Sequence, residues 1–134
     1  MSQQNVQVIQ AAYDAWNDGD MDALRAAHDP HVIARYPAEW PEPGPFVGVD
    51  QVMGQIARLR EAMDSNTAEA TTDFVDLGDR ILARFVWRGQ GRGPAFAIHG
   101  TALYTLRGGR ITAIEYFNDY AEAANLLGLP KQDT

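Results

Sequence analysis

The side chains most able to move a proton or hold an oxygen atom gather near the C-terminal end of the sequence. His99 is a candidate acid–base group, because an imidazole titrates close to neutral pH. Tyr116 and Asn118 can donate hydrogen bonds to a carbonyl or hydroxyl oxygen. We take these three as the candidate catalytic residues, for acid–base chemistry on an oxygenated small molecule. Each also has a purely structural alternative, such as a helix cap for Asn118.

A predicted β-hairpin sets the spacing of these residues. Strands over residues 94–107 and 110–118 flank a Gly-Gly pair, which is typical of a two-residue turn because both positions need a positive φ. Counting outward from this turn places the three candidate residues on one side of the hairpin and Glu115 on the other. A single bulge in the hairpin would exchange the sides.

Glu115 is the open alternative to His99. The side of the hairpin that carries it is the more apolar one. If Glu115 faced a pocket, burial would raise the pKa of its carboxyl group and make it an acid or base. If it lies on the outside, we expect it to pair with Arg84 or Arg88, and we favour this second interpretation.

Apolar spacing predicts three helices in the first half of the chain. The first helix carries an apolar stripe at steps of three and four: Val6, Ile9, Tyr13 and Trp16. The second begins at Asp20, carries Leu24 and His28 on its inner face, and ends at Pro30. The third is predicted to have Asp50 as its N-cap.

The second half of the chain has the period of β-strands. A short strand over residues 31–36 and a proline-rich loop over 37–46 come before the third helix. Further along, one face of a strand is apolar and the other carries arginines; the alternating residues are Arg80, Ile81, Ala83, Arg84, Phe85, Trp87 and Arg88. A turn is expected over residues 89–93. Asp119 caps a last helix that ends at Gly128.

Length and composition narrow the range of functions. The chain has 134 residues, which fits a single domain over residues 1–134. A net charge of −7 argues against a nucleic-acid partner, and the absence of cysteine excludes thiol chemistry. The three histidines show no metal-ligand spacing, so neither a metal nor a cofactor is expected. Without an apolar stretch that could cross a membrane, or a signal-like N-terminus, we expect a cytoplasmic protein with no membrane partner.

Several motifs, taken in order, resemble the nuclear transport factor 2-like superfamily and its SnoaL-like, polyketide-cyclase-like branch. They lie at residues 8–24, 40–46, 105–111 and 119–123. The resemblance implies an α+β fold, in which a cone-shaped, curved antiparallel or mixed sheet wraps around three N-terminal helices and a short C-terminal helix follows. It also implies a pocket at the wide end and a homodimer joined through the outer face of the sheet.

The resemblance further implies which residues meet a ligand. It favours His99, Tyr116 and Asn118 as the pocket side of the hairpin, because cavity residues of the family alternate in that phase. The side chains expected to contact a small apolar ligand are Trp16, His28, Tyr36 and Trp40, with Glu115 included in case the phase is reversed.

The chemistry of well-known members does not transfer directly. Ketosteroid isomerases of this fold use a carboxylate where this chain has Tyr36, and a tyrosine where it has Ala12. Epoxide hydrolases place their last acid where this chain has Tyr116. The function therefore stays open between an isomerase-, cyclase- or hydrolase-type enzyme without a cofactor, a non-catalytic ligand-binding protein and a dimeric interaction domain.

Overall fold

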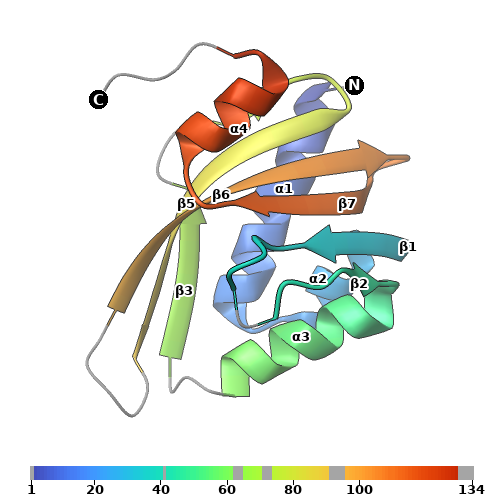
Figure 1. Cartoon of the computed structure of the whole chain (residues 1–134). Coiled ribbons are helices and arrows are strands. Elements are labelled where there is room, and N and C mark those ends of the chain that lie inside the picture. Colours follow the sequence, from blue (N-terminus) through green and yellow to red (C-terminus); the bar gives the residue numbers. More distant parts are fainter. Residues whose placement is uncertain (1, 41, 62–64, 71–73, 91–95, 130–134) are drawn as a thin grey trace.

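The computed structural model describes residues 2–40, 42–61, 65–70, 74–90 and 96–129 (Figure 1). The helices among them are α1 (Ser2–Asp18), α2 (Met21–Ala26), α3 (Val49–Glu61) and α4 (Tyr120–Leu127). The strands are β1 (His28–Arg35), β2 (Phe46–Val47), β3 (Ser65–Ala70), β4 (Val75–Asp76), β5 (Arg80–Gln90), β6 (Phe96–Arg107) and β7 (Arg110–Phe117). In this described part, no helix is both long and apolar enough to cross a bilayer.

The strands form one mixed sheet. Their order is β2-β1-β7-β6-β5-β3, with β4 paired to β5 beside this path. β1 runs parallel to β7, whereas the other pairs are antiparallel. Figure 1 shows the long strands β5 and β6 curving around α1, with α3 beside β1 and β2. The predicted α+β class is therefore confirmed.

The two faces of the sheet have separate hydrophobic clusters. The inner cluster joins α1 and α3 to the sheet and includes Ile81, Ala83, Ala102 and Tyr104. The outer cluster lies under α4 and contains Leu82, Leu103, Phe117 and Ala123. Neighbouring residues of β5 and β6 thus enter opposite clusters, as the two-residue period of a strand requires.

The predicted helix boundaries are partly confirmed. The carboxylates of Asp20 and Asp119 accept hydrogen bonds from backbone N–H groups of α2 and α4. Gly128 ends α4 with a φ of 70°. Asp50 is not an N-cap, because α3 already begins at Val49 and Asp50 lies in its first turn. A carboxylate there still stabilises the positive end of the helix dipole.

The placement of His28 on the second helix is wrong. That helix ends two residues earlier, and His28 is the first residue of β1, paired with Ile111 of β7. Pro30 lies within β1, in the stretch where pairing with β7 is interrupted before Ile33. The residue spacing would allow α2 to continue for one more turn. Pairing of His28 with β7 favours the extended strand instead.

A β-bulge shifts the register of the predicted hairpin. Both turn glycines have positive φ angles, 61° and 77°, as expected. Beyond the turn, Leu106 pairs with Ile111 but Thr105 pairs with Ala113. Thr112 is therefore an extra residue in β7. Residues 91–95, which include the end of the turn predicted at 89–93 and the start of the strand predicted at 94, lie outside the described residues.

Candidate functional site

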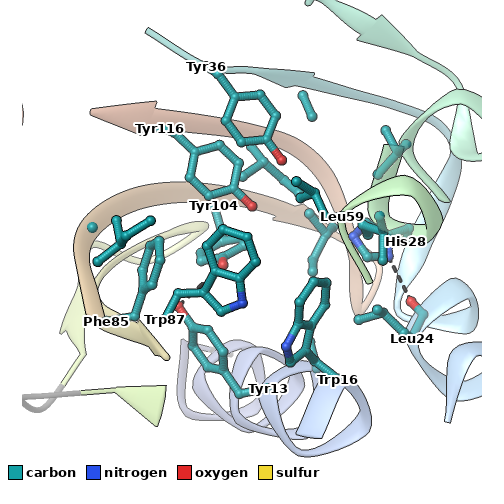
Figure 2. A pocket seen from close by; sticks show the side chains of 18 of the residues that line it. Tyr13, Trp16, Leu24, His28, Tyr36, Leu59, Phe85, Trp87, Tyr104 and Tyr116 are labelled. Atoms are coloured by element: carbon teal, nitrogen blue, oxygen red, sulfur yellow. Dashed lines mark hydrogen bonds between the residues drawn. The ribbon is translucent and has the colours of Figure 1, made fainter. Parts of the chain in front are cut away.

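The inner face of the sheet and the helices in front of it enclose a pocket of about 130 Å³ (Figure 2). Its aromatic lining residues are Tyr13, Trp16, Tyr36, Trp40, Phe85, Trp87, Tyr104 and Tyr116. An apolar cavity of about 150 Å³ can hold benzene, so this pocket has room for roughly one six-membered ring. Within the described ranges, no Asp, Glu, Lys or Arg lines it, and no three His, Asp or Glu side chains are placed to hold a metal ion.

Four tyrosines bring hydroxyl groups into this aromatic lining. The Tyr104 hydroxyl donates to the Tyr13 hydroxyl at 3.3 Å, and the Tyr36 hydroxyl donates to Gln55 Oε1 at 2.9 Å. The rings of Tyr36 and Tyr116 are stacked, with centroids 4.3 Å apart and planes within 3°. The tyrosines come from α1, β6 and β7 and from the residue after β1, so the fold itself gathers them.

Burial keeps these phenols protonated. It raises the pKa of Tyr116, although hydrogen bonding with the hydroxyls of Tyr36 and Tyr104 partly lowers it. Burial is also the main cause of the raised pKa values of Tyr13, Tyr36 and Tyr104. At neutral pH all four are therefore uncharged phenols in surroundings of low polarity, where hydrogen bonds are strong.

His28 is a buried imidazole on the pocket wall, with 5% of its surface exposed. Its Nδ1 lies 2.7 Å from the carbonyl oxygen of Leu24. Because a carbonyl can only accept, Nδ1 carries the proton, and Nε2 of the neutral ring is an acceptor. Burial lowers the pKa of His28, and the hydrogen bond to Leu24 partly offsets this effect. His28 is thus neutral at neutral pH.

The structure also places the other expected contact residues on the pocket wall. Trp16 lies on α1, and the guanidinium of Arg60 lies 5.1 Å above its ring. Tyr36 and Trp40 have ring centroids 5.2 Å apart. The loop that carries Trp40 is tied to α3 by an ion pair of 2.9 Å between Glu42 and Arg58. Helix α1 and the segment that follows β1 therefore both contribute aromatic side chains to the pocket wall.

The prediction that His99 faces the pocket is wrong. Its side chain is exposed on the outer face of the sheet, opposite Val86 of β5. Glu115 is also exposed on that face, paired with Leu103. The bulge is the reason: it pairs Tyr116 with Ala102, so Tyr116 joins the even-numbered residues of β6 on the pocket side. Neither of the two rival acid–base groups lines the pocket.

Asn118 is not a pocket residue either. It is exposed, and its side-chain amide donates a hydrogen bond to a carboxylate oxygen of Glu39. Glu39 neighbours Trp40 in the loop after β1. Asn118 therefore ties the loop that carries Trp40 to the end of β7.

Tyr13 and Tyr104 line the pocket, although neither is among the contact residues that the sequence predicts. Gln55, which is buried and accepts the hydrogen bond from Tyr36, is not among them either. The sequence does contain one indication for Tyr104. It lies on the same face of its strand as Gly100, and a glycine within a strand often marks a place where another group approaches closely.

The fold is shared with many solved structures. TerC, crystallised with polyporic acid, is 19% identical, with a TM-score of 0.76 and coverage of 93% of this chain and 98% of TerC. An NTF2-like protein of unknown function from Burkholderia pseudomallei is 22% identical, with a TM-score of 0.76 and coverage of 92% and 96%. A Jannaschia protein described as a SnoaL-like polyketide cyclase is 18% identical, with a TM-score of 0.74 and coverage of 96% and 94%. At these identities the likeness establishes the fold alone.

Sequence comparison identifies the family. No curated protein matches the chain at a significant level. A family model described as the SnoaL-like domain matches residues 9–114, which include most of the pocket wall and every strand up to the middle of β7. The chain therefore belongs to the SnoaL-like domain family.

Proposed function

We propose that the pocket binds a small apolar molecule of about one ring that carries a carbonyl or hydroxyl oxygen, and that the chain acts on it by acid–base chemistry. The single observation behind this proposal is the group of four neutral tyrosine hydroxyls in a pocket otherwise lined mainly by aromatic and aliphatic side chains. Aromatic walls take up the apolar part of a ligand, and a few polar groups fix its orientation.

Tyr116 is the proposed catalytic donor to the ligand oxygen. Its ring lies between those of Tyr36 and Phe85, with centroid distances of 4.3 Å and 6.2 Å, so its direction is held by packing. A donor fixed in this way stabilises negative charge that develops on the oxygen during proton transfer. Tyr36, His28, Trp16 and Trp40 are the proposed contacts to the rest of the ligand. The crystal of the similar protein TerC with polyporic acid supports an organic ligand in this fold.

Titration with cyclohexanone tests the proposal, because it is a single ring with one carbonyl. Binding is expected with a Kd on the order of 1 mM or tighter. Tyr116→Phe removes the proposed donor and should weaken binding about fivefold, the usual worth of one hydrogen bond. Tyr120→Phe is the matched control, since Tyr120 belongs to the outer cluster. Equal affinities of Tyr116→Phe and the wild type would contradict the role of Tyr116, and no binding at all would contradict the proposal.

A second candidate is non-catalytic ligand binding. It is favoured by the lack of any carboxylate among the described lining residues, since carboxylates serve as the base in the enzymes that the sequence resembles. Cyclohexanone binding without any acceleration of proton transfer would support this candidate.

The homodimer through the outer sheet face is likewise a proposal. α4 covers one end of this face through its contacts with β6 and β7. In support of the dimer, Ala97 and His99 near the other end of β6 are exposed on the same face. Native mass spectrometry at micromolar concentration should give twice the 14.8 kDa chain mass. A monomer under these conditions would contradict the dimer.

A further inference from the structure

We infer that His28 is the general base of the pocket, and that its Nε2 removes a proton from the carbon next to the ligand's carbonyl. The inference rests on the proposed binding of an oxygenated ring. The carboxylate base of the ketosteroid isomerases corresponds to Tyr36 in this chain, directly after the end of β1. The inference places the proton acceptor at the other end of that strand, on His28.

The geometry of His28 fixes which nitrogen is available. The hydrogen bond from Nδ1 to the carbonyl of Leu24 orients the ring and determines its tautomer. Figure 2 shows the second ring nitrogen turned away from Leu24, on the side of the pocket. A base held by a backbone carbonyl in this way needs no further rearrangement before it accepts a proton.

The surroundings keep this nitrogen uncharged and therefore free to accept a proton. The titratable groups that share the pocket wall with it are Tyr13, Tyr36, Tyr104 and Tyr116. All four stay protonated, because burial raises the pKa of each. No charged side chain of the described residues lines the pocket, so His28 is the lining group whose ordinary pKa of 6.5 is nearest to neutrality, and burial lowers this pKa further. His31 and His99 are exposed and absent from the lining.

The proposed step is a reversible enolisation. The C–H bond next to the carbonyl breaks, and its proton bonds to Nε2. The C–H electron pair forms a carbon–carbon double bond, while the carbonyl π pair moves onto the oxygen. Tyr116 holds that oxygen by a hydrogen bond. The imidazolium then returns the proton to the same carbon or, in an unsaturated ring, to the far end of the double bond. No other reactant is needed.

Isomerisation of 3-cyclohexenone to 2-cyclohexenone tests this step, and the absorbance of the conjugated product follows it. The wild type should accelerate the reaction over buffer. His28→Gln should reduce kcat by about 100-fold or more, the usual contribution of a general base, and this loss should far exceed the change in KM or in cyclohexanone affinity that follows from altering one ligand contact. His99→Gln, the outer-face control, should stay within about twofold of the wild type.

The pH profile separates a base from a structural residue. If His28 is the base, kcat/KM of the wild type falls as the pH is lowered, with a midpoint below the ordinary histidine value of 6.5. This measurement does not depend on how well His28→Gln folds. Wild-type activity in His28→Gln, or a profile without this acidic limb, would overturn the inference. Cyclohexanone binding without isomerisation would overturn it while leaving ligand binding intact, whereas no binding would remove both.

Discussion

The two faces of the β6–β7 hairpin carry different kinds of side chain. The face with the usual acid–base groups is not the face that lines the pocket. The outer face carries an imidazole on His99 and a carboxyl group on Glu115, and both side chains are exposed to water. The inner face carries Tyr104 and Tyr116, which stay neutral because they are buried in an aromatic pocket. The comparison shows that position relative to the pocket, rather than intrinsic acidity, decides which residues can act on a ligand.

The largest expected effect comes from the inner face at Gly100. A Cβ atom there would lie 2.3 Å from the Phe85 ring, so Gly100→Ala must push this ring into the pocket. Overpacking of this kind costs about 2 kcal/mol of unfolding free energy, and it should also abolish cyclohexanone binding. Urea unfolding and ligand titration would measure both. His99→Ala, one residue away on the outer face, should change stability by less than about 0.5 kcal/mol; equal losses for the two variants would remove the distinction between the faces.

Much of the fold follows from the sequence because its signals are local. Asp20 and Asp119 cap helices through their own side chains, and the two turn glycines supply the positive φ angles of the hairpin. The register of the hairpin was less accessible, because Thr112 has no sequence feature that marks it as an extra residue. One bulge therefore reversed the assignment of His99 while leaving that of Tyr116 intact.

The pocket could be predicted only in part for the same reason. Trp16, Tyr36 and Trp40 come from segments whose inward faces the apolar spacing or the family resemblance indicates. His28 was expected in the pocket but from a helix, and its neutral state depends on the Leu24 carbonyl and on burial by the assembled wall. These are tertiary properties that no local pattern encodes.

The next largest effect compares one buried and one outer tyrosine. Tyr104→Phe removes the hydroxyl that donates to Tyr13, and it should lower the unfolding free energy by about 1 kcal/mol. Tyr120→Phe makes the same chemical change in the outer cluster, where the ring lies 5.0 Å from the Arg84 guanidinium, and should be nearly neutral. Urea denaturation of both variants measures the difference. A loss of similar size in each would show that the hydroxyl network adds nothing to the inner face.

A pH-dependent effect on stability distinguishes the inner histidine, His28, from the outer one, His99. The folded-state pKa of His28 lies below its unfolded value of 6.5, so the unfolded chain binds a proton first as the pH falls. This histidine's contribution to stability is therefore complete above pH 6.5. It decreases below 6.5 by at most about 1.4 kcal/mol per pH unit, until the folded pKa is reached. Urea unfolding from pH 7.5 to 5.5 should show this slope in the wild type and in His99→Gln, but not in His28→Gln. An unchanged slope in His28→Gln would place the proton uptake elsewhere.

The smallest expected effect is also the sharpest test of the bulge. In the structure Glu115 is exposed, so Glu115→Gln should change the unfolding free energy by less than about 0.5 kcal/mol and leave cyclohexanone binding unchanged. In the register without a bulge, Glu115 would face the pocket, where an unpaired carboxylate is costly. Its replacement by an uncharged amide would then stabilise the protein by more than 1 kcal/mol, and the gain would shrink as the carboxyl group became protonated at lower pH. Denaturation of Glu115→Gln at pH 7.5 and 5 therefore decides between the two registers, because they predict different magnitudes at neutral pH and different pH dependences.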